Sequence, residues 1–123
     1  MKVLGYIRVS TAHQDFSKQK HLLLEYSQQQ RLIIDEFVEV EISSRRSTKE
    51  RRIDELLSKL EAGDRQLVAE LSRLGHNMLE TLNIINELSE KRISITFIRQ
   101  PELSTTGSYA KLLLAIYSYF AES

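Results

Sequence analysis

The chain has 123 residues, 41% of them hydrophobic and 28% charged, and its 17 basic side chains balance 17 acidic ones. This length and composition predict one compact domain with its own core, and a net charge of zero argues against a freestanding DNA-binding domain, which is usually basic. The absence of cysteine excludes disulfides, thiolate metal sites and cysteine nucleophiles.

No apolar run is long enough for a membrane span, and Arg8 interrupts the N-terminal run too early for a signal peptide. We therefore expect a cytoplasmic protein with no membrane partner. The three histidines are not spaced like zinc ligands, and the acids form no tight cluster of the kind a two-metal nuclease needs. We expect any chemistry to proceed without a metal or other cofactor.

Strands and helices are predicted to alternate four times along the chain. Apolar and β-branched runs predict strands at 2–9, 32–42, 66–71 and 93–99. Helical spacing predicts helices at 12–30, 47–63, 77–91 and from 106 to the end of the chain. Ser47 with Glu50, and Asn77 with Glu80, resemble helix-capping pairs. The pattern predicts an α/β fold with a mostly parallel central sheet and helices on both faces.

Two helices have a clear inward face. In the helix at 12–30, Gln19 lies on an apolar stripe with Phe16, Leu23 and Tyr26. A buried amide needs hydrogen-bond partners, so Gln19 belongs either to a polar site network or to a locally satisfied core position. The helix at 77–91 is expected to turn four side chains inward: Met78, Leu82, Ile85 and Leu88.

The last helix is apolar around nearly its whole circumference. Its apolar side chains are Leu112, Leu113, Leu114, Ile116, Tyr117, Tyr119 and Phe120. A helix of this kind is buried on every side, whereas one small domain covers only one side. The pattern favours an interface with a second copy of the chain, and a central core helix is the alternative. Because the chain stops within this helix without a capping signal, we expect it to be a fragment of a longer protein.

Strand alternation predicts a polar group at the end of the first strand. Tyr6, Arg8 and Ser10 share one face with Leu4, whereas Val3 and its alternate neighbours share the other. Ligands of open parallel sheets bind beyond the carboxyl ends of the strands. An arginine in an apolar strand is costly unless an anion meets it, so this group indicates an anion site.

Further arginines are predicted to reach the same edge of the sheet. The strand at 66–71 delivers Ser72, Arg73 and His76, and Arg51 and Arg52 lie in the first turns of the capped helix, where the helix dipole favours an anion. Guanidinium groups bind phosphate in bidentate fashion, stabilise the charge that builds during displacement, and ease deprotonation of a serine. A phosphate site with Ser10 as nucleophile is the prediction.

The basic segment 45–52 contributes to this prediction. It contains Arg45, Arg46, Lys49 and Arg52, close in sequence to Arg51 of the predicted phosphate site. A solvated charged face is the alternative interpretation of this segment taken by itself. A phosphate-binding signalling domain without a serine nucleophile is a weaker hypothesis, because the chain has neither a glycine-rich phosphate loop nor an acidic cluster at the strand ends.

Two motifs resemble those of a known family over the whole chain. The run from Tyr6 to Thr11 (YIRVST), with Gln14 three positions on, is followed downstream by 72–75 (SRLG) and by the segment 98–105 (IRQPELST) before the last helix. In this order they resemble the catalytic domain of the serine recombinases, the resolvase and DNA-invertase group. The resemblance implies a division of the protein into three parts. These are a catalytic core at 1–106, the start of an interface helix at 107–123, and a helix-turn-helix DNA-binding domain that lies outside this chain.

The resemblance implies a reaction and a set of site residues. Ser10 would attack the scissile DNA phosphate and displace the 3′ oxygen, leaving a 5′-phosphoserine link that stores the bond energy for religation without ATP or metal. Arg8 and Arg73 would hold the phosphate oxygens. The other site residues implied are Tyr6, Gln14, Gln19 and Ser72, with a third arginine for which Arg51 is the best match and Arg45, Arg46 and Arg52 are competitors. The resemblance also assigns Arg45, Arg46, Lys49 and Arg52 to DNA binding. The partners implied are double-stranded DNA at specific recombination sites and further copies of the chain, as a dimer and then a synaptic tetramer.

Two positions depart from the family pattern. Ser72 stands where aspartate is frequent, and His76 stands where the family's motif normally has arginine. Histidine can donate a proton to the leaving 3′ oxygen, but it supplies no permanent bidentate charge. An impaired recombinase homologue with only an assembly or regulatory role is therefore the alternative function.

Overall fold

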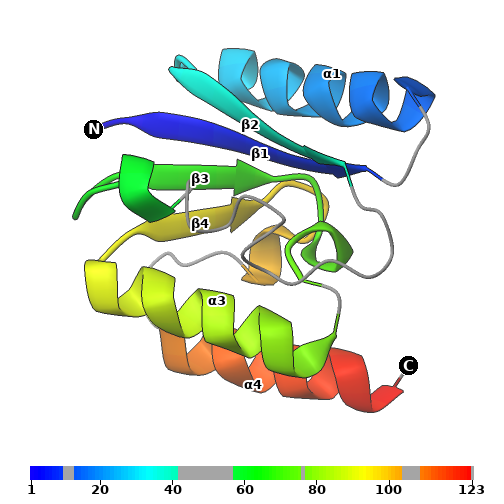
Figure 1. Ribbon diagram of the computed structural model, residues 1–123, viewed down its shortest axis with the longest axis vertical. Helices are drawn as coiled ribbons and strands as arrows, with labels where there is room; N and C mark the ends of the chain where they lie inside the picture. Colours follow the sequence, from blue (N-terminus) through cyan, green and yellow to red (C-terminus); the bar gives the residue numbers. More distant parts are fainter. Residues whose placement is uncertain (10–12, 42–56, 76, 104–108, 123) are drawn as a thin grey trace.

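The computed structural model describes residues 1–9, 13–41, 57–75, 77–103 and 109–122, and Figure 1 shows their arrangement. The strands are β1 (Val3–Val9), β2 (Glu36–Glu41), β3 (Arg65–Val68) and β4 (Ser94–Phe97). The helices are α1 (His13–Gln29), α3 (Met78–Lys91) and α4 (Tyr109–Glu122), with short 3₁₀ turns η2 (Leu71–Arg73) and η3 (Pro101–Leu103).

The four strands form one sheet in the order β2-β1-β3-β4, and all three pairings are parallel. Helix α1 covers one face of the sheet, whereas α3 and α4 lie together on the other (Figure 1). The predicted α/β class, parallel sheet and two helical layers are confirmed. None of the helices in the described ranges is long and apolar enough to cross a membrane.

The core is divided by the sheet as strand alternation requires. On the α1 face, Val3 and Ile7 of β1 pack with Leu23 and Leu67. On the other face, Leu4 and Tyr6 belong to a larger cluster, and its further members are Val38, Val68, Ile84, Ile85, Leu88, Ile95, Phe97, Leu112 and Ile116. Leu57 and Leu60 lie in the described part of the helix predicted at 47–63, and both are also buried in this cluster.

Three boundaries differ from the sequence predictions. The strand predicted at 32–42 begins only at Glu36, because the chain after α1 is used to end that helix. Arg31 has a φ of 57°, and the Leu32 N–H donates to the Ser27 carbonyl at 2.8 Å, as in a Schellman C-cap. The strand predicted at 66–71 is β3, which ends at Val68, and the strand predicted at 93–99 is β4, which ends at Phe97.

Helix α3 begins where the capping pair predicted. The Asn77 side chain accepts a hydrogen bond from the Glu80 N–H at 2.8 Å, which satisfies one free donor of the first turn. The prediction that Met78 faces inward is wrong: its side chain is on the exposed side of this first turn, and Thr81 and Ile84 are buried instead. Ile85 and Leu88 are buried as predicted, and Leu82 is partly buried.

Asp64 joins three segments at the amino-terminal edge of the sheet. Its carboxylate accepts hydrogen bonds from the backbone N–H of Lys2 at 2.9 Å and of Glu61 at 2.8 Å. These two bonds, the one from Lys2 foremost, hold the pKa of Asp64 below its ordinary value. A carboxyl with a depressed pKa stabilises the fold above its unfolded pKa, and this contribution disappears as the pH falls through the folded value.

Asp64→Asn is therefore expected to lower the free energy of unfolding at pH 7 by about 1–2 kcal/mol. It should also flatten the loss of stability that the unsubstituted protein shows below about pH 4. Urea denaturation at pH 7 and at several acid pH values measures both effects. Glu87→Gln, on the exposed side of α3, removes one carboxylate as a control. If both variants kept the acid dependence of the parent, the role assigned to Asp64 would be wrong.

Candidate active site

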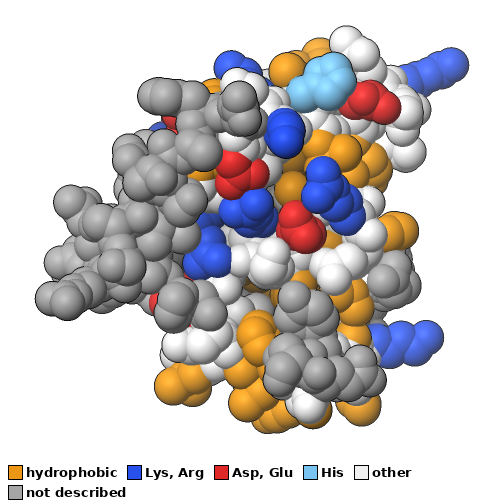
Figure 2. All heavy atoms as spheres, turned by 90° about the vertical axis from the view of Figure 1, so that its right-hand side faces the viewer, with side chains coloured by type: hydrophobic (Ala, Val, Ile, Leu, Met, Phe, Trp, Pro, Cys, Tyr) orange, Lys and Arg blue, Asp and Glu red, His pale blue; other side chains and the backbone are white. Residues whose placement is uncertain are grey.

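The sheet opens between its two central strands at their carboxyl ends. Pairing of β1 with β2 continues to Val9 and Glu41, whereas pairing of β1 with β3 ends at Tyr6 and Val68. After the last pair, which involves Tyr6 of β1, the chain that follows β3 turns away from β1 into η2. Side chains, rather than backbone hydrogen bonds between strands, therefore connect the end of β1 with η2. Figure 2 looks onto this edge, where basic and acidic side chains alternate at the centre of the described surface.

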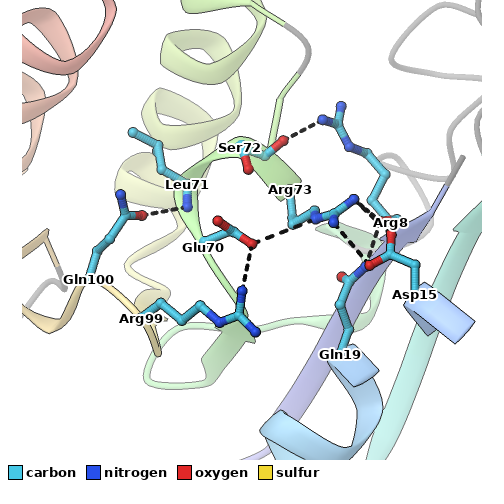
Figure 3. A network of polar contacts seen from close by, with 9 residues as sticks. All are labelled: Arg8, Asp15, Gln19, Glu70, Leu71, Ser72, Arg73, Arg99 and Gln100. Carbon is cyan, nitrogen blue, oxygen red and sulfur yellow. Dashed lines mark hydrogen bonds and ion pairs between the residues drawn. The ribbon is translucent and has the colours of Figure 1, made fainter. Parts of the chain in front are cut away.

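Arg8 lies in this opening. The residue is only 8% exposed, and its Nη2 donates a hydrogen bond to the carbonyl oxygen of Ser72. The side chain thus bridges β1 and η2, which are far apart in the sequence (Figure 3). Strand alternation placed Arg8 on the face of Leu4 and Tyr6, and the structure confirms that both of these neighbours are buried on that side.

The backbone carbonyl of Arg8 also connects the end of β1 to α1 and η2. It accepts a hydrogen bond from Nε2 of Gln19 at 2.9 Å and a longer one from Nη1 of Arg73 at 3.4 Å. Gln19 is 4% exposed, so α1 is attached to the end of β1 through a buried amide. Gln19 therefore contacts the same carbonyl as Arg73, and its role in a functional site stays a prediction.

Arg73 stands at the end of η2 and is held by two carboxylates. Its Nη2 donates to Oδ1 of Asp15 at 3.0 Å, and its Nη1 lies 2.9 Å from Oδ2 of the same carboxylate. Its Nε lies 3.9 Å from Oε1 of Glu70. The Asp15 contact is a bidentate pair, the geometry in which a guanidinium binds a carboxylate or a phosphate most specifically.

Asp15 and Glu70 also belong to this network, although neither is among the residues predicted from the sequence. Oε1 of Glu70 also lies 3.3 Å from Nη1 of Arg99, so this carboxylate lies between two guanidinium groups. Gln100 supports the same region, because its Oε1 accepts a hydrogen bond from the Leu71 N–H at 2.7 Å (Figure 3). A usable signal existed for Glu70, which precedes Arg73 by three positions. None existed for Asp15, which pairs across 58 positions.

The structure brings together four of the predicted site residues: Arg8, Gln19, Ser72 and Arg73. Tyr6 lies beneath them and is fully buried in the core cluster. Seven predicted residues lie outside the described part of the chain: Ser10, Arg45, Arg46, Lys49, Arg51, Arg52 and His76. Gln14 lies in α1, but its side chain is outside the described set.

This arrangement is suited to an anion. Arg8 and Arg73 present two permanently charged planar groups at the carboxyl end of β1, within a sheet edge closed on one side by α1. Within the described ranges, no three carboxylates or histidines gather closely enough to hold a metal ion. In its described part this α/β domain therefore has, at the carboxyl ends of its central strands, a polar network of two arginines, one glutamine and two carboxylates.

Comparison with known proteins identifies the family. Residues 3–123 match the model of the family "Resolvase, N terminal domain". A resolvase of Clostridium perfringens is 32% identical over 120 residues, which are 94% of this chain and 60% of that protein. The transposon Tn3 resolvase of Escherichia coli is 30% identical over 124 residues, covering all of this chain and 63% of that protein.

The fold agrees with the same assignment. The N-terminal catalytic domain of TP901-1 integrase superposes with a TM-score of 0.72 at 22% identity, covering 99% of this chain and 95% of that domain. The chain belongs to the resolvase N-terminal domain family. It spans about 60% of the length of the resolvases it matches.

Proposed function

We propose that this chain is the catalytic domain of a site-specific DNA recombinase in which Ser10 is the nucleophile. The observation that carries the proposal is the contact, at 3.4 Å, of the Arg73 guanidinium with the backbone carbonyl of Arg8, 65 positions away, at the end of the strand that leads directly to Ser10. Arginines at this edge suit a phosphodiester. Family membership supplies the reaction class, because the matched relatives are named resolvases.

In the proposed reaction, Oγ of Ser10 forms a bond to the scissile phosphorus and the bond from phosphorus to the 3′ oxygen breaks. The leaving 3′ oxygen takes up a proton, and the serine proton is released to a base or to solvent. Arg8 and Arg73 would neutralise the charge that builds on the phosphate oxygens. His76 is the proposed acid for the 3′ oxygen, and Arg51, among the basic residues of 45–52, is the proposed third guanidinium.

The partners follow from the same proposal. The substrate would be double-stranded DNA at recombination sites, recognised by a helix-turn-helix domain outside this chain, and the protein would work in the cytoplasm, where bacterial DNA lies. Residues 1–106 would form the catalytic core and 107–123 the first part of the interface helix. Leu112 and Ile116 of α4 are buried in the core, whereas Leu114 and Tyr117 are 67% and 56% exposed, which supports association through this second face.

The reaction is tested by determining which end of the cleaved DNA strand becomes covalently joined to the protein. The full-length protein is incubated with sheared genomic DNA of its source organism, labelled at either the 3′ or the 5′ ends, and separated in a denaturing gel. We expect a protein band that carries the 3′ label and not the 5′ label, because the serine would be joined to the 5′ phosphate of the downstream strand. The band should be absent in Ser10→Ala and stronger in His76→Arg, in which a permanent charge replaces histidine.

Each other outcome has a meaning. A band that persists in Ser10→Ala would reject the nucleophile, and a band carrying the 5′ label would reject the 5′-phosphoserine link. The absence of a band in both the parent protein and His76→Arg would favour the alternative function, an impaired homologue with only an assembly or regulatory role.

A further inference from the structure

The two terminal nitrogens of the Arg73 guanidinium already have a partner within the protein. Both terminal nitrogens of its guanidinium face the two oxygens of Asp15, at 3.0 Å and 2.9 Å. A phosphodiester offers two non-bridging oxygens with similar spacing and would need the same pair of N–H groups. Asp15 and a bidentate phosphate therefore compete for one edge of Arg73.

We propose that Asp15 is an internal stand-in for the DNA phosphate and keeps Arg73 in a resting state until DNA displaces it. This inference rests on the proposed function, in which Arg73 binds the scissile phosphate, and it adds a residue that governs access to that site. Asp15 lies in the first turn of α1, where the helix dipole favours a carboxylate. It lies five positions after Ser10 in the sequence.

The exposure of the pair permits the exchange. The side chains of Arg73 and Asp15 are 29% and 25% exposed, so the contact is shielded enough to persist and open enough for an anion to reach. Figure 3 shows Arg73 in the middle of the polar network, with Asp15 reaching it from α1. A salt bridge in this position is weakened by a competing multivalent anion such as DNA.

Glu70 has a different role in this proposal. Its Oε1 lies 3.9 Å from Nε of Arg73, an ion-pair distance, and 3.3 Å from Nη1 of Arg99. When Asp15 is displaced, Glu70 would still hold the guanidinium plane in place. Asp15 would be the exchangeable partner and Glu70 the permanent one.

The test measures DNA affinity without cleavage. The full-length protein carrying Ser10→Ala is titrated into a fluorescent 30-base-pair duplex of random sequence, at several salt concentrations. Asp15→Asn in this background is expected to lower the dissociation constant by about three- to tenfold, because Arg73 no longer has to leave a carboxylate. The slope of log Kd against log salt should steepen by about 0.9, the value of one added phosphate contact.

Two controls separate this effect from a general change of charge. Glu25→Gln removes one carboxylate from α1 ten positions along the helix, about 15 Å from Asp15, and should change the affinity by less than about twofold. In an Arg73→Ala background, Asp15→Asn should give no gain, as a double-mutant cycle requires for a coupled pair. Asp15→Ser, a favourable residue at a helix start, provides a second variant whose folding is checked by thermal melting.

An unchanged affinity in both Asp15 variants would overturn the proposal, as would an equal gain with Glu25→Gln or in the absence of Arg73. Because this experiment needs no covalent step, its failure is distinguishable from failure of the proposed function. If the labelled adduct forms as expected but Asp15→Asn binds DNA no more tightly, only the role of Asp15 is rejected. If no adduct forms while the affinity gain is seen, only the serine reaction is rejected.

Discussion

Gly75→Ala is expected to lower the free energy of unfolding by about 2–3 kcal/mol, because the added methyl group overpacks a rigid contact. A Cβ at this position would lie 2.3 Å from Oγ1 of Thr81 and 2.9 Å from the Cα and backbone nitrogen of the same residue. Thr81 cannot retreat easily: it is fully buried, and its Oγ1 and N–H both donate to the Asn77 carbonyl, at 2.8 Å and 3.0 Å.

Gly63→Ala is the matched comparison for this prediction. Gly63 has a φ of +91°, yet no heavy atom would lie within 4 Å of its added Cβ. Its substitution tests backbone strain without crowding and is expected to cost about 1 kcal/mol. Urea denaturation gives both values. A loss at Gly75 no larger than the loss at Gly63 would contradict packing against α3 as the reason for Gly75.

A double variant tests where the crowding comes from. Thr81→Ala removes the nearest atom, but the backbone of α3 stays 2.9 Å from the new methyl group. Gly75→Ala should therefore remain destabilising when it is added to Thr81→Ala. Because Gly75 follows Arg73 by two positions, we also expect the same substitution to displace η2 and to weaken formation of the covalent adduct.

The alternating pattern of the sequence was sufficient for the architecture. Apolar runs separated by helical spacing predicted four parallel strands with helices on both sides, and the register of β1 confirms the two faces assigned to Leu4 and Val3. The ends of elements were harder to predict. Helices α1 and α3 both end at an arginine in the left-handed conformation, Arg31 and Arg92, rather than at the glycine that usually marks this cap.

The site was predictable only where strand geometry controls it. Arg8 follows from alternation along β1, and Arg73 follows from its place after a neighbouring strand. Asp15 could not be found in this way, since its contact depends on the angle of η2 against α1, which no local pattern encodes, whereas Glu70 is detectable only from its spacing of three positions from Arg73. Bulk charge was also a poor guide, because Arg73 and Arg99 at this edge are each paired with a nearby acid.

Arg8→Met is expected to lower the rate of covalent adduct formation by about a thousandfold or more, because it removes a preorganised cation from the proposed phosphate site. Arg8→Lys should lose about a hundredfold, since a single ammonium keeps the charge but not the bidentate fork. Rates are measured from the 3′-labelled band under single-turnover conditions. Arg99→Met, a substitution of the same type at an arginine whose side chain is 57% exposed, should stay within about threefold of the parent.

The stability of Arg8→Met is expected to change far less than its activity. Arg8 is buried, and replacing a buried charge with an apolar side chain of similar length is often neutral or stabilising. The Ser72 carbonyl would lose one donor, so we expect a net change within about 1 kcal/mol. A large loss of stability would mean that Arg8 serves mainly to join β1 to η2. Full stability combined with a nearly absent adduct would instead mean that the buried cation serves to bind the phosphate. The protein would then fold equally well with an apolar side chain at this position.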